Sequence, residues 1–261
     1  HTKREIEVIL KRSQLAFLGW RNADVRERGA LMKKAARVLR ENKANYATII
    51  TREMGKPITE AEAEVEKCAL TCEYYAVNTR KMMTEEVIKT SASRSYVRFD
   101  PLGTILLVMP WNFPFWQVFR AAVPSLMAGN AVLLKHASNV SRCSLTIEAI
   151  FKEAGFPDGL FQSMLMVPGK VGRLIRDPRI KAVTLTGSEE AGRSVAREAG
   201  AAIKKCVLEL GGSDPFIILK DADIPTACRQ AAFSRLINSG QSCISAKRFI
   251  VVEGVFREFI E

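Results

Sequence analysis

Apolar residues in the first part of the chain recur at intervals of three and four, which predicts a helical start. Residues 4–50 keep this spacing until Gly55-Lys56-Pro57 interrupts it. A second long helix is expected over 59–81. Its core candidates are Ala61, Val65, Cys68, Leu70 and Tyr75.

The stretch 86–100 has a different character. Glu86–Thr90 and Ser95–Phe99 have the composition of short strands and flank a Ser-rich turn. We therefore predict an edge hairpin over 86–100.

From residue 103 onward, short apolar runs alternate with helical patterns. Strands are expected at Thr104–Met109, Ala131–Lys135, Phe161–Val167, Ala182–Leu185, Cys206–Leu210 and Phe216–Leu219. Helices are expected at 115–127, 141–154, 170–176, 189–198 and 224–238. This alternation is typical of an α/β fold with a parallel sheet covered on both faces. Glycines and a proline in Gly211–Pro215 suggest a boundary, so we divide the chain into 1–210 and 211–261.

The bulk composition excludes several classes of protein. The chain has 261 residues, of which 48% are hydrophobic and 26% charged, as in ordinary globular proteins. No apolar run reaches the roughly 18 residues of a membrane helix, and no signal-peptide pattern follows the charged start. We therefore expect a cytoplasmic protein without a membrane partner.

The formal charge of +11 does not predict a nucleic-acid partner. Lys and Arg are mixed with Glu along the predicted helices, and no basic stripe is interleaved with aromatic residues. None of the six cysteines has metal-site spacing, so no metal is expected. Cys68 and Cys72 are interpreted as core thiols on one helix face.

Polar and turn residues follow three of the predicted strands, in Met109–Asn112, Leu134–Ser138 and Leu185–Gly192. Open parallel sheets bind ligands beyond the carboxyl ends of their strands. Gly187 permits a tight turn and Ser188 begins a helix, whose free N–H groups attract phosphate. An N-cap formed by Ser188 would explain the same residues without any ligand.

Two residues in the last quarter of the chain could carry chemistry. Cys243 follows Gly240-Gln241-Ser242 and could be a nucleophile, and Glu209 ends an apolar strand before Gly211-Gly212 and could be its base. Taken singly, the cysteine reads as structural, the glutamate as a solvated charge and Asn112 as a turn residue.

Together, three motifs resemble the active-site motifs of the aldehyde dehydrogenase superfamily. They are Pro110-Trp111-Asn112-Phe113-Pro114, Val207–Gly212 and Gly240-Gln241-Ser242-Cys243, in this order. The resemblance implies a variant Rossmann sheet with N-terminal helices, followed by the start of an α/β catalytic domain. Residues 1–210 would bind the nucleotide, 211–261 would begin the catalytic domain, and the hairpin would serve oligomerisation.

The resemblance also implies a reaction. Cys243 would attack an aldehyde to form a thiohemiacetal, whose oxyanion accepts hydrogen bonds from Asn112 and the Cys243 backbone. After hydride transfer, Glu209 would activate the water that hydrolyses the thioester.

The implied cofactor is NADP or NAD. Gly187 and Ser188 would meet its pyrophosphate, and Lys135 would bond the adenosine ribose. Trp111 and Asn112 would lie beside the nicotinamide half, and the Leu210 backbone would contact the carboxamide. Ser138 stands where many NAD-preferring relatives have Glu, which favours acceptance of NADP because no carboxylate repels its 2′-phosphate; a simple loop cap is the other interpretation.

Within the superfamily, the chain looks like the succinate-semialdehyde dehydrogenase branch. The resemblance rests on Lys135-His136-Ala137, Leu208–Phe216 and Ala246–Ile250. By this resemblance Arg120, expected two helical turns from Asn112, would bind the substrate's far carboxylate, with Arg235 as a second candidate. A surface or inter-subunit salt bridge is the alternative for Arg120. His136 is interpreted as an exposed or packing residue.

Relatives extend well past residue 261, so two other interpretations of the function of this chain stay open. The chain could be a nucleotide-binding fragment without turnover, or part of a dehydrogenase for another small aldehyde. The resemblance implies a homo-oligomer, a dimer or tetramer, for the complete protein.

Overall fold

The computed structural model describes residues 1–261 and begins with four helices, α1 (Lys3–Trp20), α2 (Val25–Glu41), α3 (Lys43–Met54) and α4 (Ile58–Met82). Capping boxes at Thr2 and Asp24 start the first two, since each side chain accepts a backbone N–H of the first turn. Gly55, with φ of 89°, ends α3 in the left-handed region. The predicted helical start is confirmed.

Five parallel strands form the central sheet in the order β5-β4-β3-β6-β7. Their bounds are β3 Thr104–Met109, β4 Ala131–His136, β5 Phe161–Ser163, β6 Ile180–Thr186 and β7 Lys205–Glu209. The α/β fold class predicted from the alternation is confirmed. The strand expected to reach Val167 already ends at Ser163, where its pairing with β4 stops at Leu134.

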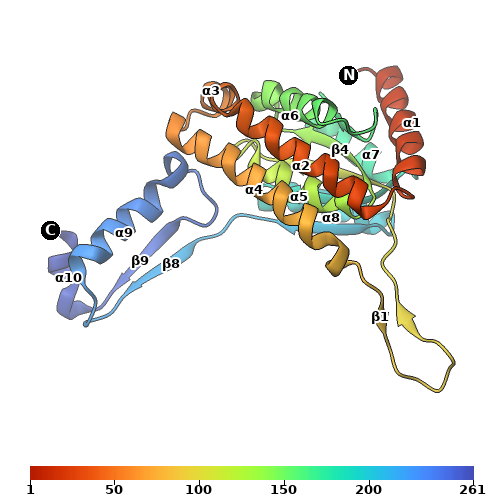
Figure 1. Ribbon diagram of the computed structural model, residues 1–261. Helices are drawn as coiled ribbons and strands as arrows, with labels where there is room; N and C mark the ends of the chain where they lie inside the picture. Colours follow the sequence, from red (N-terminus) through yellow and green to blue (C-terminus); the bar gives the residue numbers. More distant parts are fainter.

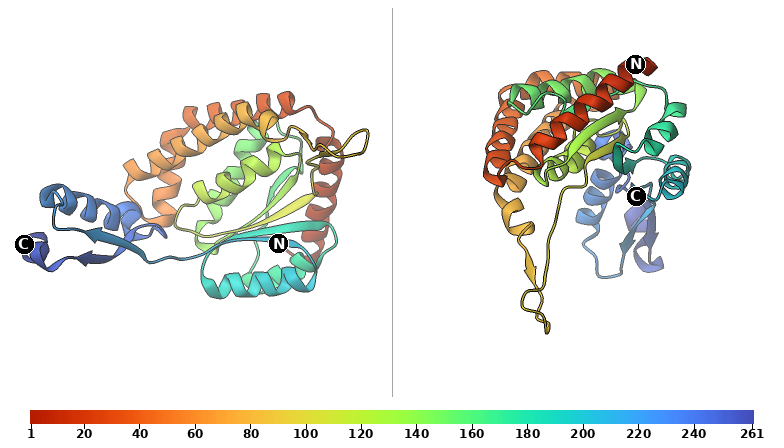
Figure 2. Two further views of the ribbon diagram at one scale, coloured as in Figure 1. Left: turned by 90° about the horizontal axis from the view of Figure 1, so that it is seen from below. Right: turned by 90° about the vertical axis from the view of Figure 1, so that its right-hand side faces the viewer.

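Helices cover both faces of this sheet, as Figures 1 and 2 show. On one face, α5 (Trp116–Met127) and α6 (Ser141–Glu153) pack on β3, β4 and β5, and α2–α4 lie outside them. On the other face, α7 (Val171–Arg176) and α8 (Glu189–Ala201) pack on β6. Neighbouring strand residues such as Leu106 and Leu107 enter separate hydrophobic cores, as alternation requires. Cys68 and Cys72 are buried, as predicted.

The predicted hairpin is present as β1 (Glu86–Val87) and β2 (Tyr96–Val97), which pair antiparallel. It projects away from the helices and the sheet (Figure 1). Apolar side chains on it, including Val87 at 80% exposure, contact solvent.

The last 48 residues, 214–261, lie apart from the central sheet (Figure 1). β8 (Asp214–Ile218) pairs in parallel with β9 (Ala246–Val251), and α9 (Ile224–Leu236) connects them. The strand expected at 216–219 was grouped with the strands of the central sheet. Neither β9 nor α10 (Glu253–Ile260) was predicted from the sequence. The division of the chain into two domains stays a prediction. No helix in the structure is both long and apolar enough to span a bilayer.

Candidate active site

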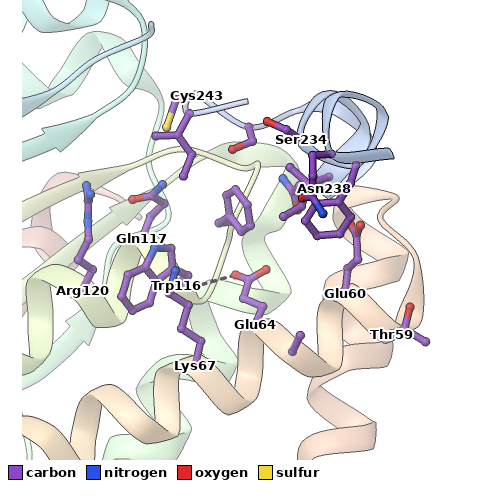
Figure 3. Close-up of a pocket in the computed structure, with 17 residues that line it drawn as sticks. Thr59, Glu60, Glu64, Lys67, Trp116, Gln117, Arg120, Ser234, Asn238 and Cys243 are labelled. Atoms are coloured by element: carbon purple, nitrogen blue, oxygen red, sulfur yellow. Dashed lines mark hydrogen bonds between the residues drawn. The ribbon is translucent and has the colours of Figure 1, made fainter. Parts of the chain in front are cut away.

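A cavity of about 720 Å³ lies between the helices α4 and α5 and the segment that carries Cys243. Figure 3 shows Cys243 facing Trp116, Gln117 and Arg120 across this space. Polar groups on its wall include Lys67, whose Nζ lies 4.0 Å from the centre of the Trp116 ring. The cavity therefore brings a thiol and a cationic side chain together beside the carboxyl edge of the sheet.

The segment before Cys243 is a strained turn. Asn238 and Ser239 have φ values of 58° and 55°, and Gly240 follows with 71°. Left-handed conformations are costly for non-glycine residues and persist only where surrounding contacts fix them. Here Nδ2 of the buried Asn238 donates to the carbonyl oxygens of Asn112, at 2.8 Å, and Gln241, at 3.3 Å. The turn thus fixes the backbone that leads into Cys243.

Asn112 belongs to the loop after β3, and it contacts the cysteine segment directly. Its Nδ2 donates to the Gln241 carbonyl at 2.8 Å. A side-chain amide has two N–H groups, so one is left for another acceptor. From the sequence, Asn112 and Arg120 were expected to lie two helical turns apart. This prediction is wrong, because α5 begins only at Trp116.

Glu209 reaches this neighbourhood through Arg120. Nη1 of Arg120 lies 3.4 Å from Oε2 of Glu209, and its Nη2 donates to Oγ1 of Thr186 at 3.3 Å. The Glu209 carboxylate is half-exposed at the end of β7 and does not line the cavity, whereas Arg120 does. Arg120 therefore forms an ion pair within the chain, with the candidate base as its partner.

Arg235 does not join this group. Its side chain is exposed, and Nη1 donates to the Gly240 carbonyl at 3.1 Å. It is absent from the cavity wall, so nothing in the structure supports the predicted contact with substrate.

The N-terminus of α8 is open for an anion. Ser188 is its N-cap and accepts the Ala191 N–H at 3.2 Å, while the N–H groups of Glu189 and Glu190 have no acceptor in the chain. By contrast, the starts of α5 and α6 are occupied by carboxylates, Glu64 on α5 and Glu53 on α6. The N–H groups of Phe115 and Trp116 at α5, and of Arg142 and Cys143 at α6, are therefore occupied, whereas those of Glu189 and Glu190 at α8 are left for a phosphate.

The other predicted nucleotide residues surround the same edge of the sheet. Lys135 is buried without an ion pair, and desolvation lowers the pKa of its ammonium. Ser138 is exposed at the start of a 3-10 turn, Ser138–Val140. Leu210 packs so closely on Gly192 that a Cβ atom added to Gly192 would lie 2.7 Å from Leu210 Cδ2. An unpaired cation and an open helix start fit a phosphate-bearing cofactor.

His136 was expected to be an exposed ring or a packing residue, and the structure shows it buried and hydrogen-bonded. Burial lowers the pKa of His136 to about 4, so the ring is neutral at pH 7. Its Nδ1 accepts the Ala137 N–H at 2.9 Å, and Nε2 donates to the Pro114 carbonyl at 2.8 Å. The ring therefore holds the loop that carries Asn112.

Several residues of the site escaped the sequence analysis. Gln117 Oε1, Glu60 Oε2 and Asn238 Oδ1 are buried without partners, and all three residues line the cavity. Buried polar atoms without partners point to a ligand or water there. Gln117 could have been identified from the sequence, because it is a polar residue within the aromatic start of α5. Nothing in the local pattern singled out Asn238.

The geometry defines a class of protein with an α/β fold whose cysteine faces a cavity at the sheet edge. Comparison with known proteins gives the family. A sequence model of the aldehyde dehydrogenase family matches residues 1–261, and the chain belongs to this family.

Several similar proteins carry related names. A probable NADP(+) succinate-semialdehyde dehydrogenase of Synechocystis is 52% identical over 262 residues, which cover 100% of this chain and 58% of that protein. An NAD(P)+ succinate semialdehyde dehydrogenase of Escherichia coli K12 is 46% identical, with 98% and 56% covered. The crystal structure of succinic semialdehyde dehydrogenase from Streptococcus pyogenes with NADP+ superposes with a TM-score of 0.96 at 40% identity, covering 99% of this chain and 57% of that one. The chain thus spans somewhat over half the length of these relatives.

Proposed function

We propose that the complete protein containing this chain oxidises succinic semialdehyde to the acid, with NADP or NAD as hydride acceptor. The observation that carries the proposal is the shared cavity of Cys243 and Arg120, with Glu209 paired to the same arginine. The names of the relatives support this substrate class.

Chemistry would begin at Cys243. Its thiolate attacks the carbonyl carbon, forming a C–S bond and an oxyanion. The free N–H of the Asn112 amide and the Cys243 backbone N–H donate to that oxyanion. When bound, the nicotinamide would supply the hydride acceptor. Loss of hydride from the former aldehyde carbon re-forms its C=O bond and leaves the acyl group on Cys243 as a thioester. Glu209 then takes a proton from water, whose oxygen attacks the thioester and releases the acid and the thiolate.

Arg120 would select the substrate. A guanidinium matches a carboxylate through paired charge-assisted hydrogen bonds. Because Arg120 and Cys243 line one cavity, a short ω-carboxylate aldehyde can meet both at once. Arg235, bound to Gly240 outside the cavity, is the weaker candidate.

The cofactor would lie along the carboxyl edge of the sheet. Gly187 and Ser188 at the open start of α8 would hold the pyrophosphate, and Lys135 the ribose. Trp111, Asn112 and the Leu210 backbone would border the nicotinamide half. The exposed hydroxyl of Ser138 brings no negative charge towards a 2′-phosphate, which supports acceptance of NADP.

The first experiment measures NADPH and NADH formation at 340 nm with succinic semialdehyde, on the complete protein and on residues 1–261 alone. Activity in the complete protein that is lost in Cys243→Ala is the expected result. Nucleotide binding without turnover of any aldehyde would contradict the proposal and favour a binding role. Turnover of uncharged aldehydes only would keep the enzyme class and reject the substrate.

We also propose that the complete protein is a homo-oligomer that uses the hairpin 86–100. The hairpin projects from the body of the molecule, and its apolar side chains are exposed to solvent. Exposed apolar residues on a paired strand favour association with another chain.

A further inference from the structure

Lys56 and Glu64 form a buried ion pair that no step of the proposed reaction uses. Their side chains are 0% and 1% exposed, and Nζ of Lys56 contacts Oε2 of Glu64. Desolvating two charges offsets much of their attraction, so a buried pair contributes little stability compared with apolar residues of the same size. Stability alone therefore does not account for this pair.

The second oxygen of Glu64 holds the start of α5. Oε1 accepts the backbone N–H groups of Phe115 and Trp116, each at 2.8 Å. No side chain of α5 itself caps this end. A carboxylate at a helix N-terminus satisfies free donors and interacts favourably with the helix dipole. Glu64 thereby fixes the downstream end of the loop 110–114.

Lys56 holds the middle of the same loop. Its Nζ lies 4.1 Å from the centre of the Phe113 ring, a cation–π contact in a dry environment. Phe113 directly follows Asn112, whose Nδ2 reaches the Gln241 carbonyl. The pair thus contacts the chain at Phe113, Phe115 and Trp116, immediately after the residue that reaches the cysteine segment.

We propose that Lys56 and Glu64 are positioning residues that set the placement of the Asn112 amide relative to Cys243. This inference rests on the proposed function, in which Asn112 donates to the oxyanion. Oxyanion donors act only over a narrow range of distance, so a small shift of the loop lowers the rate of the chemical step. Arg120 and the start of α8, which are proposed to bind the substrate carboxylate and the pyrophosphate, lie outside this loop, so KM should change less than kcat.

The chain offers a matched control. Glu53 is also a carboxylate from the N-terminal helices, and it accepts the N–H groups of Arg142 and Cys143 at 2.8 Å each. It caps α6 in the way Glu64 caps α5, yet it makes no hydrogen bond to the loop 110–114. Glu53→Gln therefore removes the charge of a comparable cap and one of its two acceptor oxygens, without touching the loop that carries Asn112.

The test is a double-mutant cycle in the complete protein. Glu64→Gln and Lys56→Met are each combined with Asn112→Ala, and kcat is expressed per folded molecule, with the folded fraction of each variant measured by near-UV circular dichroism. Each single variant is expected to lower kcat about tenfold with KM nearly unchanged, and less than about twofold in the Asn112→Ala background. Glu53→Gln is expected to change kcat by the same factor in both backgrounds.

Equal losses of kcat in both backgrounds for Glu64→Gln would show a purely structural role and overturn the inference. If Asn112→Ala itself leaves kcat unchanged, the proposed role of Asn112 fails, and the inference fails with it. Should Lys56→Met leave an unpaired charge that prevents folding, the neutral double variant Lys56→Met/Glu64→Gln enters the same cycle and is judged by the same criterion.

Discussion

Nη1 of Arg120 lies 3.4 Å from Oε2 of Glu209, so the residue proposed to bind the substrate carboxylate also holds the carboxylate proposed as base. Arg120 reaches Glu209 on one side and the cavity of Cys243 on the other. A substrate carboxylate would therefore compete with Glu209 for the same guanidinium.

Replacing Arg120 should separate charged from uncharged aldehydes. Arg120→Gln is expected to raise the KM for succinic semialdehyde about 10- to 100-fold, because hydrogen bonds to a charged group are lost. The KM for butanal, which has the same chain length, should change less than about threefold. Steady-state kinetics with both aldehydes give the answer, and Arg235→Gln is the comparison. A larger effect from Arg235→Gln would move the carboxylate site to that residue.

Replacing Glu209 should uncouple hydride transfer from hydrolysis. Glu209→Gln retains the side-chain shape but cannot take a proton from water. One equivalent of NADPH per Cys243 should still form in a rapid burst, while steady-state turnover falls about 10²- to 10⁴-fold. Stopped-flow absorbance at 340 nm separates the two phases. Loss of the burst together with turnover would assign Glu209 to an earlier step.

Cofactor choice should respond to a single charge at residue 138. Ser138→Glu brings a carboxylate towards the position proposed for the 2′-phosphate, and like charges repel. The ratio of kcat/KM with NADP to kcat/KM with NAD should fall about tenfold or more, a change of about 1.4 kcal/mol. Ser138→Gln is the neutral control of the same size. If the ratio is unchanged in Ser138→Glu, Ser138 has no role in cofactor choice and only caps its loop.

His136 should make the stability of the fold depend on pH. Its pKa is lowered from 6.5 to about 4 in the folded chain, so the unfolded chain binds the extra proton first as pH falls. Stability is therefore full above pH about 6.5 and is lost as pH falls towards about 4, at up to about 1.4 kcal/mol per pH unit. Denaturant unfolding at several pH values measures this slope.

The matched variant for this slope is His136→Gln. It does not titrate, and its amide can still donate to the Pro114 carbonyl, the partner of His136 Nε2. The free energy of unfolding should depend more steeply on pH in the wild type than in the variant, and only between these two pKa values. Parallel curves would mean that folding does not lower the pKa of His136.

The hairpin prediction concerns the mass of the assembly. Val87→Lys with Val97→Lys places charges on exposed apolar positions of β1 and β2. Light scattering on the complete protein should then show a smaller assembly, because burying an unpaired lysine at an interface is costly. An unchanged mass would place the interface elsewhere.

The fold could be predicted largely from local patterns. Strands such as Thr104–Met109 are continuous apolar runs, which is the signature of a buried parallel strand. Helix ends coincided with caps and breakers such as Gly55. β9 and α10 were missed because Ala246–Val251 has only one buried residue, so its pattern is that of neither a buried strand nor a loop.

The site was predicted only where a motif marks it. Cys243, Asn112 and Glu209 stand in recognisable runs, and the structure joins them through Gln241 and Arg120. The contacts of Lys56 with Glu64 and Phe113 depend on how α4 packs on α5, which no local spacing encodes. In the sequence, Lys56 appeared only as part of a helix break.

The carboxylates that α3 and α4 place on the starts of α6 and α5 have a consequence for protein engineering. A chimaera that grafts this sheet onto the N-terminal helices of another protein must bring Glu53 and Glu64 with it. Without them, the N–H groups of Phe115, Trp116, Arg142 and Cys143 lose their acceptors, and unpaired donors at a helix start lower the stability of the fold. The N-terminal helices thus complete the starts of α5 and α6, although they carry none of the residues proposed for the chemistry.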